Sequence, residues 1–289
     1  MDVMGPLVSG DWLARSIGDP RVRVIDFRWY LDGRSGRAAY QAGHIPGAAF
    51  VDLDGQVTGH RPGAGRHPLP DREPFERAMR AAGVGRESLV VVYDDQGGTP
   101  AARLWWMLRY FGHDPAAVLD GGLRAWPGPL ATGDEAIPPG DFAAAEPRQD
   151  MKLDYDAVRG LAAPTLLIDA RAPERYRGEV EPLDSRAGHV PGALNLDWNG
   201  NLGPDGRLKP PEELRRRFAA AGVHDGGEVV AYCGSGVSAC HDILAMEVAG
   251  LQGARLYPGS WSEWSGRPDA PVAVGPSAAG LEEAEPRLG

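Results

Sequence analysis

Short apolar runs, many of them β-branched, alternate along this chain with segments in which apolar residues recur every three to four positions. The runs VRVIDFR at 22–28, VVVY at 90–93 and VVAY at 229–232 predict buried strands. EPFERAMRAAG at 73–83 and PEELRRRFAAAG at 211–222 have the periodicity of amphipathic helices. Strands that alternate with helices predict crossover units and parallel sheets, so the fold class is α/β.

The chain contains an internal repeat. AGHIPGA at 42–48 returns as AGHVPGA at 187–193, and VVVYDDQGG at 90–98 returns as VVAYCGSGV at 229–237. Two further pairs of segments match in the same order. VRVIDFR and TLLIDAR precede the two AGHxPGA segments, and VLDGGLRAW and RLYPGSWSEW follow the segments at 90–98 and 229–237. Four matches in one order predict a tandem of two related domains.

The composition between and after the repeats sets the expected domain boundaries. Residues 132–150 combine Pro, Gly, Ala and acidic residues without periodicity, which is typical of a linker. We therefore expect an N-terminal domain over 1–131, a C-terminal domain over 151–272 and an irregular tail over 273–289.

Composition and charge exclude several classes of protein. The 289 residues are 43% hydrophobic, enough for two cores, and no window is apolar enough for a membrane span. The start of the chain lacks the pattern of a secretory signal, so the expected location is the cytoplasm. A net charge of −10 argues against a nucleic-acid partner, and two cysteines cannot make a disulfide framework.

Cys233 lies where a predicted strand meets a glycine-rich loop and then a predicted helix over 238–251. Ligands of parallel sheets bind beyond the carboxyl ends of the strands, which is where this loop falls. Glycines allow close backbone approach, and the helix dipole favours an anion at this end. We expect the amide groups of Gly234, Ser235, Gly236, Val237 and Ser238 to surround the sulfur and favour a nucleophilic thiolate. The alternative is that Cys233 is a small buried hydrophobe.

The second cysteine has a different context. Cys240, Leu244, Val248 and Leu251 recur at helical spacing, so Cys240 is expected to be a core residue. The chain has no CxxC motif and no paired His/Cys spacing, and we expect no metal site.

The repeat provides an internal comparison for Cys233. The matching position in the first domain is Asp94, which cannot perform thiol chemistry. Only the second domain is therefore expected to be catalytic. His44, His189, Asp26 and Asp169 occur in both copies, so we expect them to brace loops and to take no part in catalysis.

These motifs together resemble the two-domain rhodaneses, which are thiosulfate or 3-mercaptopyruvate sulfurtransferases. The resemblance rests on GHIPGA, GHVPGA, CGSGVS and YPGSWSEW, and it extends over about residues 8–272. It implies a tandem of two rhodanese-like domains, an inactive first and an active second, with the site between them. It also implies a persulfide on Cys233, a thiol or cyanide as sulfur acceptor, a thioredoxin-like protein as candidate reductant, and no cofactor.

The loop sequence bears on the sulfur donor. Loops resembling CRKGVT accompany thiosulfate in that family and loops resembling CGSGVT accompany 3-mercaptopyruvate, so CGSGVS favours mercaptopyruvate and leaves thiosulfate as the alternative. The resemblance further implies a serine, histidine and aspartate set that protonates the departing enolate, here Ser235, His67 and Asp54. Without the resemblance, His67 would be interpreted as a loop histidine and Asp54 as a turn residue.

The resemblance also implies arginines that bind the donor carboxylate before the second GHxPGA element. Arg175 matches the first of them. At the second place the chain is shorter and has Leu183, so Arg186 is the nearest substitute and Arg177 a further candidate. Each of these arginines could instead be an ordinary surface residue.

Two other functions use a similar loop. A cysteine phosphatase needs an arginine after five intervening residues to bind phosphate, but that position is Ala239. A sulfur carrier that holds a persulfide for a partner protein would have the same loop as an enzyme. Turnover with a free donor distinguishes the carrier from the enzyme.

Overall fold

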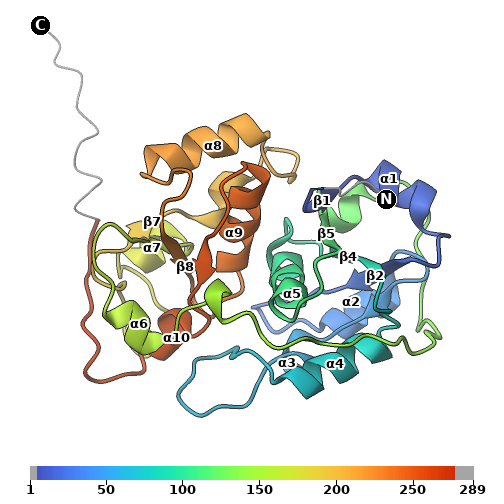
Figure 1. Cartoon of the computed structure of the whole chain (residues 1–289), viewed down its shortest axis with the longest axis horizontal. Helices are drawn as coiled ribbons and strands as arrows, with labels where there is room; N and C mark the ends of the chain where they lie inside the picture. The colour runs from blue at the N-terminus through green and yellow to red at the C-terminus, as the bar shows by residue number, and fades with distance from the viewer. Residues whose placement is uncertain (1–4, 277–289) are drawn as a thin grey trace, which may run out of the picture.

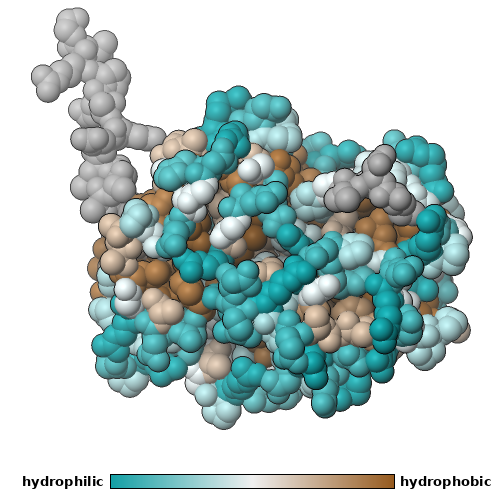
Figure 2. Space-filling view, viewed as in Figure 1, coloured by the Kyte–Doolittle hydropathy of each residue, from teal (hydrophilic) through white to brown (hydrophobic). Residues whose placement is uncertain are grey.

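The computed structural model describes residues 5–276 and contains two α/β domains that lie side by side (Figure 1). Each domain is built on a sheet in which every pair of neighbouring strands is parallel. This confirms the predicted fold class. Hydrophilic side chains cover most of the face seen in Figure 2, and hydrophobic residues are visible mainly in the recesses between them.

The first sheet has five strands in the order β1-β5-β4-β2-β3. Its strands are β1 (Leu7–Val8), β2 (Val22–Asp26), β3 (Ala49–Phe50), β4 (Leu89–Tyr93) and β5 (Ala116–Leu119). The helices of this domain are α1 (Gly10–Ser16), α2 (Gly36–Ala42), α3 (Leu53–Gln56), α4 (Arg72–Ala81) and α5 (Thr99–Tyr110).

The second sheet has four strands, in the order β7-β6-β8-β9. They are β6 (Leu166–Asp169), β7 (Leu194–Asn195), β8 (Val229–Tyr232) and β9 (Arg255–Leu256). The helices are α6 (Tyr155–Arg159), α7 (Pro173–Tyr176), α8 (Pro211–Ala220), α9 (Ala239–Val248) and α10 (Ser260–Trp264). None of the described helices is both long and apolar enough to cross a membrane.

Helices α5 and α9 pack against each other and join the two domains (Figure 1). One hydrophobic cluster runs through both, from Trp105 and Leu108 on α5 to Cys240 and Leu244 on α9. The spacing analysis correctly placed Cys240 on a core face. It missed that α9 is also buried on the side of His241, where Nε2 of His241 lies 3.0 Å from the carbonyl oxygen of Gly97 in the first domain.

The segment 132–150 follows the surface of the first domain. Phe142 is fully buried, and the backbone amide of Phe142 donates to the carbonyl of Val84. The segment is thus irregular in structure, as the composition indicates, but it is docked along most of its length. After the second domain, Ala273 pairs with His189, while residues 277–289 of the predicted tail lie outside the described residues.

Residues that match between the two copies have the same structural role in each domain. Asp26 accepts hydrogen bonds from the backbone and guanidinium of Arg28, and Arg28 also donates to the carbonyl of Gly43. Asp169, Arg171 and Gly188 repeat the arrangement in the second domain. These buried ion pairs fasten the GHxPGA loops to the strand ends.

The two histidines of these loops make equivalent contacts as well. Nδ1 of His44 lies 2.9 Å from the carbonyl oxygen of Tyr40, and Nδ1 of His189 lies 2.8 Å from that of Tyr176. Each imidazole stacks on the ring of the same tyrosine. The bracing role expected for both histidines is consistent with these contacts.

Asp94 occupies the loop that corresponds to the Cys233 loop. Its carboxylate is buried and accepts hydrogen bonds from the amides of Gln96 (2.7 Å), Gly98 (2.9 Å) and Ala101 (2.9 Å). Burial raises the pKa of Asp94 to about 6, although the amide groups stabilise the anion. The first copy thus holds a carboxylate of the protein itself in the amide cradle of this loop.

Asp94 should make the stability of the protein depend on pH. Its pKa is higher in the folded protein than the ordinary value of 3.8, so folding takes up a proton and stability is lost as the pH rises towards about 6. Asp94→Asn removes this titration. We expect the difference in unfolding free energy, wild type minus variant, to shift in favour of wild type by about 2 kcal/mol between pH 7 and pH 4 in urea titrations. A difference that does not change with pH would contradict this prediction.

Candidate active site

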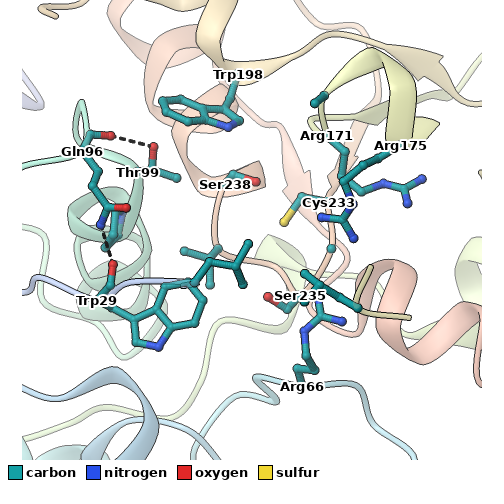
Figure 3. Close-up of a pocket in the computed structure, with 16 residues that line it drawn as sticks. Trp29, Arg66, Gln96, Thr99, Arg171, Arg175, Trp198, Cys233, Ser235 and Ser238 are labelled. Carbon is teal, nitrogen blue, oxygen red and sulfur yellow. Dashed lines mark hydrogen bonds between the residues drawn. The ribbon is translucent and has the colours of Figure 1, made fainter. Parts of the chain in front are cut away.

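Cys233 lies at the carboxyl end of β8, at a cavity between the two domains (Figure 3). The cavity has a volume of about 290 Å³. Its lining comes from the first domain (Trp29, Leu31, Arg66, Gln96, Thr99, Pro100) and from the second (Arg171, Ala172, Arg175, Leu183, Trp198, Cys233, Gly234, Ser235, Val237, Ser238). The sulfur thus lies at a cavity that both domains line.

The loop after Cys233 wraps back on the sulfur. The amide of Gly236 lies 3.2 Å from Sγ, and Gly236 has a φ of +78°, a conformation that favours glycine. The amide of Cys233 itself donates to Oγ of Ser260, at 3.2 Å. Ser260 is held at a φ of +53°, and its hydroxyl also donates to the carbonyl of Tyr257. These bonds fix the backbone on both sides of the thiol.

Ser235, His67 and Asp54 form a continuous hydrogen-bonded chain across the domain boundary. Nδ1 of His67 lies 2.8 Å from Oγ of Ser235, and Nε2 lies 3.1 Å from Oδ1 of Asp54. The other carboxylate oxygen of Asp54 accepts from Nε1 of Trp29, at 2.8 Å. The structure therefore brings together the three residues that the resemblance identified.

The His67 ring is neutral at physiological pH. Burial lowers the pKa of His67 to about 4, and this outweighs the opposing effect of the Asp54 carboxylate. Because a carboxylate oxygen accepts, Nε2 carries the proton and Nδ1 is left to accept from the hydroxyl of Ser235. The edge of the ring packs against Trp29, with ring centroids 5.0 Å apart. The histidine is thus oriented as a base towards the serine.

Two residues that the sequence analysis did not select complete the site. Arg103 of α5 is fully buried and donates to the carbonyls of Gly236 and His67, both at 3.0 Å. Arg66 lines the cavity beside Gly234. A charged residue inside the apolar helix 99–110 was a signal for Arg103, but the sequence does not indicate what that side chain contacts.

The two predicted carboxylate ligands have different positions. Arg175 lines the cavity, as required of a residue that binds the donor. Arg186 is not among the residues that line it, and its guanidinium donates to the carbonyls of Trp264, Ser265, Arg267 and Ala270. These four acceptors occupy the donors of Arg186, so its role is to brace the end of α10 and the turn that follows. The interpretation of Arg186 as a substrate ligand is therefore corrected.

The remaining predicted residues lie at the cavity or in the core. Gly234, Val237 and Ser238 line the cavity, and Gly236 contributes the amide that contacts the sulfur. Cys240 is fully buried, and its thiol donates to the carbonyl of Gly236. Burial raises the pKa of the Cys240 thiol to about 12. Among the described residues no cluster of His, Cys, Asp and Glu is arranged to hold a metal ion.

The two cysteines should differ in reactivity. Cys233 lines the cavity, whereas Cys240 is enclosed and remains protonated at about pH 8. We expect iodoacetamide to add to native wild-type protein at Cys233 only, and to native Cys240→Ala protein at the same site. Cys233→Ser protein should remain unmodified until it is unfolded. Peptide mass spectrometry checks this, and labelling of Cys240 in the native protein would contradict it.

Comparison with known proteins places this site in a family. The model of the rhodanese-like domain matches residues 9–128 and 155–267. A Pseudomonas aeruginosa protein provisionally named 3-mercaptopyruvate sulfurtransferase is 45% identical over 93% of this chain and 98% of its own length. A Mycobacterium tuberculosis protein provisionally named thiosulfate sulfurtransferase SseB is 42% identical over 89% of this chain and 92% of its own length.

A solved structure agrees with these sequence matches. The structure of SseA from Escherichia coli, described as a 3-mercaptopyruvate sulfurtransferase with the rhodanese fold, superposes with a TM-score of 0.79. It is 36% identical, and the match covers 90% of this chain and all of that one. Because both domains match the family model and the relatives match over nearly their whole length, the chain belongs to the rhodanese family.

Proposed function

We propose that this protein is a sulfurtransferase that moves a sulfur atom from 3-mercaptopyruvate, through a persulfide on Cys233, to a thiol or cyanide. The observation that carries the proposal is the contact between Ser235 and His67. It joins a hydroxyl two residues from the cysteine to a neutral imidazole of the other domain, 2.8 Å away. A loop cysteine beside such a proton relay suits a donor whose leaving group must be protonated.

The donor assignment rests on charge as well as on the relatives. Two of the relatives compared above are described as 3-mercaptopyruvate sulfurtransferases, and the one named for thiosulfate keeps that donor as the alternative. In the loop itself, Gly234 and Ser235 add no positive charge after the cysteine. A donor with one carboxylate needs less positive charge than the dianion thiosulfate. The uncharged loop thus supports mercaptopyruvate.

In the first half-reaction the thiolate of Cys233 attacks the thiol sulfur of the donor. A sulfur–sulfur bond forms while the carbon–sulfur bond breaks, and the electron pair of the broken bond leaves with carbon as the enolate of pyruvate. The proton of the donor thiol ends on that enolate carbon, which gives pyruvate and an anionic persulfide. Atoms and electrons balance without an external oxidant or reductant.

The relay supplies the route for this proton. Nδ1 of His67 accepts the proton of Ser235, and the serine oxygen can then accept the proton of the donor thiol. Reversal of the same path returns the proton to the enolate after the carbon–sulfur bond has broken. Asp54 keeps the ring in the tautomer that this requires.

In the second half-reaction an acceptor removes the outer sulfur. A thiolate or cyanide attacks it, and Cys233 leaves as the thiolate that starts the next cycle. A thioredoxin-like dithiol would release the sulfur as hydrogen sulfide and would itself become a disulfide. The amide of Gly236, 3.2 Å from Sγ, can donate to the thiolate and stabilise it as it leaves.

Two other functions are less well supported. A phosphatase of the cysteine class needs an arginine at the position of Ala239 to bind phosphate bidentately. A carrier that only holds a persulfide has no use for a hydrogen-bonded relay of serine, histidine and aspartate. If neither free donor is turned over while the isolated protein holds an extra sulfur on Cys233, the carrier assignment replaces the enzyme.

Ser235→Ala should separate the two donors. The variant cannot pass a proton to the enolate, so we expect kcat/KM for 3-mercaptopyruvate to fall about 100-fold. Sulfite, the leaving group of thiosulfate, needs no proton on carbon, so kcat/KM for thiosulfate should change by less than about 3-fold. Steady-state assays with cyanide as acceptor, run on both proteins with both donors, measure this.

Ser238→Ala is the matched control. It removes another hydroxyl from the same loop, and none of the described contacts joins that hydroxyl to His67. It should affect the two donors to the same extent. An equal loss on both donors in Ser235→Ala would remove the proton-relay role, and a general preference of wild type for thiosulfate would favour the alternative donor.

A further inference from the structure

Two guanidinium groups from different domains meet beside the cysteine. Arg66 comes from the segment before α4, and Arg175 comes from α7 (Figure 3). A Cβ atom placed on Gly234 would lie 2.9 Å from Nη2 of Arg66 and 3.5 Å from Nη1 of Arg175. Both groups therefore approach the residue that follows Cys233.

A buried carboxylate holds the two arginines together. Oδ1 of Asp184 pairs with Nη1 of Arg66, and Oδ2 lies 3.3 Å from Nη2 of Arg175. Nη2 of Arg175 also donates to Glu181, at 2.7 Å. The contacts of the described residues leave Nη2 of Arg66 and Nη1 of Arg175 without a protein acceptor. These two N–H groups are the ones nearest to Gly234.

The Nε atoms of both arginines lack hydrogen-bond partners too. Nε of Arg66 and Nε of Arg175 are buried, with no hydrogen-bond acceptor in the described structure. Unpaired donors on buried cations are costly unless a ligand satisfies them. Two positive groups with free donors at a cavity are suited to a planar carboxylate, which accepts from both.

Position 183 cannot supply the second cation that the rhodanese resemblance led us to expect. Leu183 is apolar, and 41% of its surface is exposed at the cavity. Arg186 is engaged by backbone carbonyls of the second domain. Of the basic side chains described, Arg66 is the one that lines the cavity with a free donor next to that of Arg175.

We propose that Arg66, from the otherwise inactive domain, binds the donor carboxylate together with Arg175 and so determines specificity for α-keto acid donors. This inference rests on the proposed function. Asp184 and Glu181 pair with other nitrogens of these guanidinium groups, which leaves the two donors beside Gly234 for one carboxylate. The first domain then contributes His67 and Asp54 of the proton relay as well as one of the two anchors.

The test uses two donors that differ only in the carboxylate. 3-Mercaptopyruvate has it, and 1-mercaptopropan-2-one has the same thiol and ketone without it. In Arg66→Leu we expect kcat/KM for 3-mercaptopyruvate to fall about 10- to 100-fold, mainly through KM, because a hydrogen bond to a charged group is lost. With mercaptopropanone kcat/KM should stay within about 2-fold of wild type.

Two further variants sharpen the result. Arg61→Leu removes a cation from the same segment that pairs with Asp71 on the surface, and it should leave both donors unaffected. Leu183→Arg in the Arg66→Leu background returns a guanidinium to the cavity from the second domain, and it should recover most of the lost kcat/KM for 3-mercaptopyruvate. Recovery would exclude a merely structural role of the Arg66–Asp184 pair.

The outcomes separate this inference from the proposed function. Equal losses on both donors in Arg66→Leu would overturn the inference, because Arg66 would then only brace the domains. Pyruvate binding to Cys233→Ser protein, measured by calorimetry, tests the anchor without turnover. If pyruvate affinity does not depend on Arg66, the inference fails even when mercaptopyruvate is a good substrate. If affinity does depend on Arg66 but no donor is turned over, the anchor stands and the enzymatic function fails.

Discussion

The site depends on one buried cation, the guanidinium of Arg103. It extends from α5 of the first domain and donates to the carbonyls of Gly236 and His67. A buried charge is costly unless it is well bonded, and removal of its acceptors would leave it uncompensated. This cost stabilises the loops that contain Gly236 and His67 in their observed positions. The cysteine loop and the histidine segment belong to different domains, and this bond fixes their distance. The contact of 2.8 Å between His67 and Ser235 follows from it.

The loop at Asp94 and the matching loop at Cys233 have different roles in the two copies. In the first copy the carboxylate of Asp94 occupies the amide cradle. In the second copy the amide of Gly236 contacts a thiol that lines a cavity. Because Asp94 stands at the cysteine position, the first domain has no thiol in this loop. Its loops instead line the cavity at Cys233. Asp54 and Trp29 of this domain hold His67 in position there.

The sequence predicted those features that depend on local pattern or on the repeat. The parallel sheets, the position of Cys233 at a strand end and the core position of Cys240 follow from periodicity and from the order of the motifs. The chain from Ser235 to Asp54 was identified only through the family resemblance, because its members are far apart in sequence. Arg66 and Arg103 were missed and Arg186 was misassigned for one reason. The direction of a long side chain at a domain boundary is decided by how the domains pack, and no local pattern encodes it. The burial of both sides of α9 was missed for the same reason.

The docking of the domains is therefore part of the chemistry proposed for this protein. The nucleophile, Ser235 of the relay and one arginine come from the second domain, whereas His67 and Asp54 of the relay and the other arginine come from the first. Neither domain alone could hold a donor carboxylate while protonating its enolate. The apolar packing of α5 against α9 supplies the attraction between the domains, and the segment 132–150, fastened by the buried Phe142, keeps the connection short and bound to the first domain. Rigid docking has a catalytic purpose here, because a proton relay works only while its atoms stay within hydrogen-bonding distance. A hinge between the domains would break the contact of Ser235 with His67, and at the same time it would separate Arg66 from Arg175.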